Sequence, residues 1–208
     1  MKFYFDSHKK NKILPAAYFQ HEDVVGMAKD LIGKVLVTDF EGKKTSGIIV
    51  ETEAYTGIND KAAHSYGGKR TARTEVMYQP GGVAYVYLCY GIHHLFNIVT
   101  NKKDIPQAIL IRALQPLEGI DIMLQRRKKI KADYTLTRGP GSLAGALGLN
   151  RSHTGLLLGQ KLIQVEDRGI VIPDSDIRCG ARIGVAYAGA DALLPYRFWA
   201  DGNPYVSK

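Results

Sequence analysis

The sequence predicts an α+β fold: a single domain with a curved, largely antiparallel sheet, peripheral helices and a protruding β-hairpin. Three observations carry this prediction. β-branched and aromatic runs with period-two alternation fill the middle of the chain and are typical of strands. Apolar residues at helical spacing lie outside these runs. The segments between successive strands are short enough for hairpins. No Pro/Ser-rich or low-complexity linker divides the 208 residues, so residues 1–208 are expected to form one domain.

The N-terminal quarter predicts one helix and one hairpin. Residues 1–12 are expected to be partly disordered, as chain ends often are. Residues 21–33 have helical spacing and end in a glycine, which predicts a helix. Residues 35–39 and 47–55 are rich in β-branched side chains and predict two strands. The Glu-Gly pair at 41–42 between them is typical of a hairpin turn.

The middle of the chain predicts a second hairpin and a further strand. Residues 83–89 and 95–100 both read as strands in their apolar alternation, and the segment 90–94 joins them. Tyr90 would therefore stand at a hairpin tip, where a large aromatic side chain gains little from its own fold. Residues 109–113 predict the next strand.

The C-terminal half mixes short helices and strands. Residues 119–124 have helical spacing and precede the basic run 126–131, whose cations suit a helix C-terminus. Gly139-Pro140 predicts a helix start, because proline is favoured in the first turn. Short strands are expected at 161–166, 182–185 and 196–199.

Residues at period-two spacing place chemical groups on common faces. Side chains alternate across a strand, so Glu51, Glu53 and Tyr55 point the same way, as do Tyr85 and Tyr87. Together they could line a pocket with aromatic walls and a carboxylate, which suits gripping a flat base and hydrolysing the bond that holds it. A lone glutamate on a strand is usually solvated, and that interpretation stays open for Glu51. No His or Cys lies beside the glutamates at ligand spacing, so no metal is expected.

The charge balance favours a polyanionic partner. The chain has 28 Lys and Arg against 20 Asp and Glu, a net charge of +8, and such a surface binds nucleic acid in a salt-dependent way. Lys69, Arg70 and Arg73 lie between the pocket segments and are the predicted phosphate contacts. The run 126–131 is more simply a solvated helix end.

Cysteines and hydropathy favour an intracellular setting. Two cysteines are too few for a disulfide framework and suit a reducing compartment. The first dozen residues lack the apolar segment of a signal peptide, and no stretch is long enough to span a membrane. We therefore expect a cytoplasmic protein with access to chromosomal DNA.

Long motifs make the chain similar to the alkyladenine (3-methyladenine) DNA glycosylase family of base-excision repair. The matching segments cover most of the chain in the family's order. They are VETEAYTGINDKAAHSYGG (50–68), PGGVAYVYLCYGIHHLFNIVT (80–100), AILIRALQPLEG (108–119), RGPGSLAGAL (138–147), RIGVAYAG (182–189) and LPYRFWADGNPYVS (194–207). The resemblance implies a monofunctional enzyme without a cofactor, acting as a monomer on double-stranded DNA that contains alkylated or deaminated purines.

The resemblance also implies roles for single residues. Glu53 matches the general base that activates water, and Arg112 matches an arginine that helps to hold this water together with the backbone carbonyl of Ile183. Tyr90 matches the side chain that intercalates where the flipped base has left. The residues that match the base pocket are Tyr55, His64, Tyr85, Tyr87 and Asn97, of which Asn97 disfavours the exocyclic amino group of guanine.

Three alternatives remain open from the residues alone. Lys61 or Lys69 could act as the amine nucleophile of a bifunctional glycosylase. A noncatalytic nucleic-acid-binding module would explain the charge and the aromatic residues. A glycoside or nucleoside hydrolase would explain the carboxylate but not the positive charge or the tip tyrosine.

Overall fold

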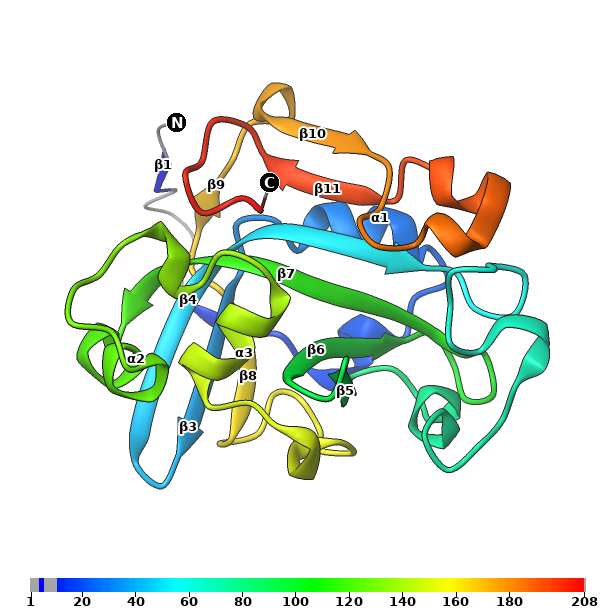
Figure 1. The fold of residues 1–208 in the computed structure, drawn as a ribbon, viewed down its shortest axis with the longest axis horizontal. Coiled ribbons are helices and arrows are strands. Elements are labelled where there is room, and N and C mark those ends of the chain that lie inside the picture. Colours follow the sequence, from blue (N-terminus) through cyan, green and yellow to red (C-terminus); the bar gives the residue numbers. More distant parts are fainter. Residues whose placement is uncertain (1–3, 6–10, 208) are drawn as a thin grey trace.

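The computed structural model describes residues 4–5 and 11–207, and its centre is a strongly curved antiparallel sheet (Figure 1). The expectation of disorder at residues 1–12 lies mostly outside the described residues. The main sheet has nine strands in the order β2-β8-β3-β4-β7-β6-β5, with β11 paired to β4 and β10 to β11. Their bounds are β2 (Lys12–Ile13), β8 (Ile163–Asp167), β3 (Val35–Phe40), β4 (Lys43–Tyr55), β7 (Gln107–Glu118), β6 (His93–Thr100), β5 (Val83–Cys89), β11 (Arg197–Ala200) and β10 (Ile177–Gly180). A separate pair joins β1 (Tyr4–Phe5) and β9 (Ile170–Val171).

Strand β4 is the axis of this sheet and changes partners along its length. It pairs with β3 up to Ile48 and with β11 at Glu51–Glu53, while β7 accompanies it on the other side. The pairing of β4 with β7 skips Val50 in one strand and Arg112 in the other. Such bulges bend a strand and re-aim side chains, so the curvature of the sheet and the direction of Arg112 have one origin.

Three α-helices cover the sheet within the described residues. Helix α1 (Val24–Asp30) begins at Asp23, whose side chain accepts the Gly26 N–H at 2.8 Å, a standard N-cap. It packs on the face of β4 that carries Thr52, whose hydroxyl donates to the Ala28 carbonyl at 2.7 Å. Helices α2 (Ile120–Arg127) and α3 (Pro140–Leu147) lie side by side near β7 (Figure 1). The main hydrophobic core lies between these helices and the sheet.

The structure confirms the predicted fold class: α+β, with a curved antiparallel sheet and peripheral helices. The three helices and the strands around residues 35–55, 83–100 and 109–113 form where the sequence predicts them. The second hairpin is tighter than expected, since β6 already begins at His93.

The strand predicted at 182–185 is wrong. Gly184 has a φ of 78°, which breaks an extended run, and the Arg182 side chain turns to Asp60 instead. Sequence reasoning also missed the short strands β1, β2, β9 and β10, of which β10 lies just before this segment. None of the four residues of β10 is buried, the segment carries little periodic signal, and β10 forms by pairing with β11.

Candidate active site

A cavity of about 540 Å³ opens between the β5–β6 hairpin, β7, the start of α3 and the loops around His64 and Ile183. This volume is typical of small-molecule sites and exceeds what a single purine needs. Most predicted site residues line it, namely Tyr55, His64, Arg73, Tyr85, Tyr87, Tyr90, Asn97, Arg112 and Ile183. The structure thus brings together side chains from segments more than a hundred residues apart.

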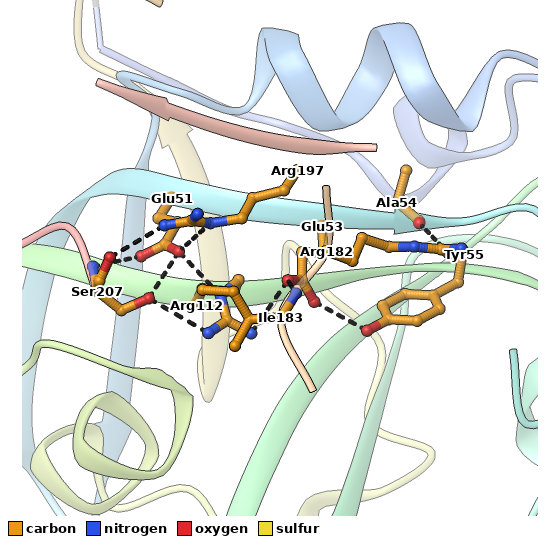
Figure 2. A network of polar contacts seen from close by, with 9 residues as sticks. All are labelled: Glu51, Glu53, Ala54, Tyr55, Arg112, Arg182, Ile183, Arg197 and Ser207. Atoms are coloured by element: carbon orange, nitrogen blue, oxygen red, sulfur yellow. Dashed lines mark hydrogen bonds and ion pairs between the residues drawn. The ribbon is translucent and has the colours of Figure 1, made fainter. Parts of the chain in front are cut away.

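Glu53 lies directly behind the wall of this cavity. Its side chain is fully buried, and each of its polar neighbours lines the cavity. Oε1 accepts the Ile183 backbone N–H at 2.7 Å, and Oε2 accepts the Tyr55 hydroxyl at 2.8 Å (Figure 2). The predicted role of Ile183 concerned its carbonyl, whereas the contact seen here uses its N–H. Burial next to Glu53 raises the pKa of Tyr55 well above its usual value, so Tyr55 remains a hydroxyl donor.

Arg112 stands between two glutamates. Its Nε donates to Oε1 of Glu51 at 2.9 Å, and its Nη1 lies 3.2 Å from Oε1 of Glu53. Burial alone would lower the pKa of Arg112, but the two carboxylates more than compensate, so the net shift is upward and the guanidinium stays charged. The bulge at Arg112 in β7 aims the side chain at this gap.

Glu51 is not a solvated strand residue, which corrects that interpretation. It is fully buried and accepts four hydrogen bonds, from Arg112, Arg197, and the hydroxyl and N–H of Ser207. Sequence reasoning named neither Arg197 nor Ser207. The only sequence signal would have been their place in the last matching motif.

A further ion pair, also missed from the sequence, lies against the Tyr55 ring. Arg182 donates to Asp60 at 2.8 Å, both side chains are almost fully buried, and the guanidinium lies 4.8 Å from the centre of the Tyr55 ring. A cation over an aromatic face is attractive. The pair therefore joins the loop that leads to His64 with the loop that carries Ile183.

His64 is held as a neutral ring. Nη2 of Arg73 lies 3.0 Å from Nε2 of His64, and the Tyr85 hydroxyl lies 2.8 Å from Nδ1. An arginine can only donate, so Nε2 accepts and Nδ1 carries the proton. Burial, with help from Arg73 and Lys69, lowers the pKa of His64 to about 4. The Tyr87 ring meets His64 edge-on at 4.6 Å.

Asn97 is a rigid part of the cavity wall. It is buried, and its amide nitrogen donates to the backbone carbonyls of Tyr85 at 3.1 Å and Leu95 at 3.4 Å. The side chain therefore has one orientation, and its bulk at this point of the cavity is fixed.

Tyr90 stands at the tip of the β5–β6 hairpin, with 89% of its surface exposed. Its φ is 50°, and Gly91 follows with a φ of 73°. A positive φ is unusual for a bulky residue and costs conformational energy. The turn thus holds an apolar ring away from the protein, beside the mouth of the cavity.

The three predicted phosphate-binding cations differ in their surroundings. Arg70 is held by Glu75 at 2.7 Å and Asp104 at 3.0 Å, and it covers the Tyr78 ring. Arg73 reaches into the cavity, with its guanidinium 5.0 Å from the centre of the Tyr87 ring. Lys69 is exposed. Neither Lys61 nor Lys69 is among the described residues that line the cavity.

The described residues contain no group of three or more His, Cys, Asp or Glu side chains that could hold a metal ion. Among the helices within residues 11–207, none combines the length and the apolar character needed to cross a membrane.

The chain is similar to known proteins along most of its length. Residues 18–204 match the family model of methylpurine-DNA glycosylase (MPG). A protein of Chlamydia felis named "Putative 3-methyladenine DNA glycosylase" is 46% identical over 187 residues, which cover 89% of this chain and 95% of the relative. A Bacillus cereus protein of the same name is 46% identical over 202 residues, covering 91% of this chain and 97% of the relative.

Proposed function

The chain belongs to the methylpurine-DNA glycosylase family and is a DNA repair enzyme, a DNA-3-methyladenine glycosylase that hydrolyses N-glycosyl bonds; from this premise we propose how it acts. The protein is proposed to be a monofunctional glycosylase of base-excision repair that flips alkylated or deaminated purines out of duplex DNA. A water activated by Glu53 then attacks the sugar, and an abasic site remains.

One observation carries the proposal: a buried carboxylate directly behind an aromatic cavity of about 540 Å³, with an exposed tyrosine at its mouth. A base inside a duplex is out of reach of any side chain, so an enzyme that acts on it must extrude it. The cavity has the size and the flat aromatic walls that an extruded purine needs.

Tyr90 is proposed to fill the space that the purine leaves. Unstacking a base costs a few kcal/mol, and an inserted apolar or aromatic side chain offsets part of this cost. The turn at the hairpin tip already directs this exposed ring outward, toward where DNA would bind. Insertion of Tyr90 explains a placement that does nothing for the protein's own core.

Base selection is proposed to rest on Tyr55, Tyr87, His64 and Asn97. N-alkylated purines are cationic, and a cation between aromatic rings gains about 0.5–2 kcal/mol per good contact. A His64 ring that is neutral near pH 7 adds no positive charge against such a base. Asn97, whose amide is fixed by two backbone carbonyls, is proposed to disfavour the exocyclic amino group of guanine.

Glu53 is proposed to take a proton from the attacking water while its negative charge stabilises the oxocarbenium-like sugar. The protein bonds of Glu53 leave Oε2 with the Tyr55 hydroxyl alone, so this oxygen has capacity for a water from the cavity side. Arg112, and the backbone carbonyl of Ile183, would hold the same water. Departure of an alkylated purine neutralises its charge, so the leaving group needs little help.

The remaining parts of the proposal concern the DNA partner. Lys69, Arg70 and Arg73 would contact phosphates beside the flipped nucleotide, with Arg70 exchanging its carboxylate partners for a phosphate. The enzyme would act as a monomer on double-stranded chromosomal DNA, in the cytoplasm.

The test compares Glu53→Gln with wild type on chemically methylated duplex DNA, with free purine scored separately from strand breaks. The variant is expected to bind a duplex with an abasic-site analogue normally and to release no base. Glu166→Gln makes the same change at a buried glutamate held by Arg168, far from the cavity, and should keep full activity. Undiminished release of base by Glu53→Gln would overturn the assignment, and a borohydride-trapped adduct would favour a lysine nucleophile.

A further inference from the structure

Glu51 and Ser207 both contact Arg112, the arginine that the proposed function assigns to catalysis. Glu51 Oε1 accepts from Arg112 Nε at 2.9 Å and from the Ser207 hydroxyl at 2.7 Å, and Oε2 accepts the Ser207 N–H at 2.7 Å. The same hydroxyl accepts from Nη2 of Arg112 at 3.2 Å. Ser207 thus bridges the carboxylate and the guanidinium (Figure 2).

The hydrogen bonds that Arg112 donates therefore go to Glu51 and Ser207. Toward Glu53 it presents Nη1 at an ion-pair distance of 3.2 Å. The plane of a guanidinium is set by its directional bonds, so the Glu51 side fixes how Arg112 faces Glu53. The pairing of β4 with β7 is irregular at Val50 and at Arg112. Such bulges re-aim neighbouring side chains, and here they lie beside the contact between Glu51 and Arg112.

The Glu51 side is itself tightly built. Arg197 donates to Glu51 Oε1 at 2.7 Å and to the Ser207 carbonyl at 3.0 Å, and Glu51 is fully buried. A buried carboxylate tolerates burial only when it is paired and hydrogen-bonded, and here its partners satisfy it. Such a cluster holds its members in one arrangement.

We propose that Glu51 and Ser207 are positioning residues for hydrolysis: they hold Arg112 so that it meets Glu53 through a single nitrogen. A free guanidinium prefers a bidentate fork on a carboxylate. Such a fork on Glu53 would occupy both of its oxygens and displace the water. Held by Glu51, Arg112 supplies its positive charge to the site and leaves Oε2 of Glu53 available.

This inference rests on the proposed function, because it assigns Arg112 and Glu53 to the reaction. Loss of Glu51 or Ser207 should slow the chemical step and leave DNA binding intact, since neither residue lines the cavity and neither is expected to touch DNA. An effect on rate without an effect on binding distinguishes loss of a transition-state interaction from loss of uniform binding.

The experiment measures single-turnover release of purine from chemically methylated duplex DNA, together with binding of a duplex that carries an abasic-site analogue. Glu51→Gln is expected to lower the rate about 10- to 100-fold, as small misplacements of catalytic groups do. Ser207→Ala removes only the bridging hydroxyl and should lower the rate about three- to tenfold. Binding should stay within about twofold of wild type in both.

A double-mutant cycle shows whether these residues act through Arg112. Placed in an Arg112→Gln background, either substitution should have little further effect on the rate, because the group that it positions is already absent. Unchanged rates for folded Ser207→Ala, or equal losses in both backgrounds, would overturn the inference. Should Glu51→Gln fail to fold, the Ser207→Ala cycle decides alone.

The outcomes separate this inference from the proposed function. Base release by Glu53→Gln would contradict the proposed function itself. If Glu53→Gln is inactive while Glu51→Gln and Ser207→Ala act at wild-type rates, only the positioning role is contradicted. Glu166→Gln again serves as the matched control for loss of a buried, arginine-paired carboxylate.

Discussion

Glu51 and Glu53 are the same residue type, two positions apart on one face of β4, and both are fully buried, yet their surroundings differ. Glu51 accepts four hydrogen bonds from three residues and faces β11 and the segment after it. Glu53 accepts two hydrogen bonds, from Tyr55 and Ile183, and backs onto the cavity. Glu51 is bonded by four donors, of which only the one from Arg112 belongs to a residue that lines the cavity, whereas Glu53 has two donors and its Oε2 lies beside Tyr55, which lines the cavity.

This difference shows how one strand can supply both a structural and a chemical carboxylate. The strand fixes only that the two side chains share a face. Their roles are set by what later segments bring to each position, with Arg197 and Ser207 on one side and Ile183 on the other. Arg112 touches both carboxylates and couples the two regions.

The largest expected effect is on stability, and its absence would contradict the difference between Glu51 and Glu53. Glu51→Gln should lower the free energy of unfolding by about 3–5 kcal/mol, because Arg112 and Arg197 then face a neutral amide in a buried site. Glu53→Gln should cost only about 1–3 kcal/mol, since fewer bonds depend on it. Urea denaturation midpoints of both variants and wild type measure this. Equal losses would mean that the two carboxylates do not differ in structural role.

The Glu53 region was largely predictable from sequence, because its signals are local. Period-two spacing places Glu51, Glu53 and Tyr55 on one face, and the apolar alternation of residues 83–89 and 95–100 predicts the hairpin with Tyr90 at its tip. The long motifs in the same segments point to a family and so to His64 and Asn97. The structure brings Tyr55, His64, Tyr90 and Asn97 to one cavity and places Glu53 behind its wall.

The Glu51 region could not be predicted in this way. Its partners Arg197 and Ser207 lie 146 and 156 positions from Glu51, so no local pattern connects them. The bulges at Val50 and Arg112 depend on how two strands pair, which a single strand's sequence does not contain. For the same reason the Asp60–Arg182 pair was missed, and residues 182–185 were wrongly predicted to form a strand.

The two regions should also respond differently to pH, because the cavity side carries His64 while the Glu51 side is closed by arginines. Burial lowers the pKa of His64 from 6.5 to about 4 in the folded protein, and Arg73 and Lys69 add to this; its other neighbours are the Tyr85 and Tyr87 rings. The unfolded chain therefore binds a proton more readily. The resulting stability is present above pH 6.5 and is lost as the pH falls toward 4.

The expected size of this pH effect is about 1–3 kcal/mol. The measurement is the change in unfolding free energy between pH 7 and pH 4.5, in wild type and in His64→Gln. Subtracting the change in His64→Gln from the change in wild type removes the contribution of other groups. A difference near zero, or one of opposite sign, would show that His64 is not held neutral by the cavity.

A smaller effect isolates the Tyr55 hydroxyl on the Glu53 side. Tyr55→Phe keeps the ring that would stack on the base but removes the donor to Oε2 of Glu53. We expect the single-turnover rate to fall about three- to tenfold with DNA binding unchanged. Tyr18→Phe is the matched control, because it removes a hydroxyl that donates to Asp30 away from the cavity. A full-rate Tyr55→Phe enzyme would mean that the hydroxyl does not orient the carboxylate.

The smallest expected effect is on the salt dependence of DNA binding. It compares the surface charges near the cavity with those elsewhere on the protein. Arginines on the Glu51 side are engaged by a buried carboxylate, so we expect cations near the cavity, rather than these arginines, to release counterions from DNA. Lys69→Gln and Arg73→Gln should each reduce the slope of log K against log salt by about 0.9. Lys29→Gln should leave the slope unchanged, because Lys29 lies on α1, on the face of β4 opposite Glu53, where it pairs with Asp174. Binding of an abasic-site duplex at several salt concentrations gives these slopes. Equal slopes for all three variants would place the DNA away from the cavity, and with it the extruded base.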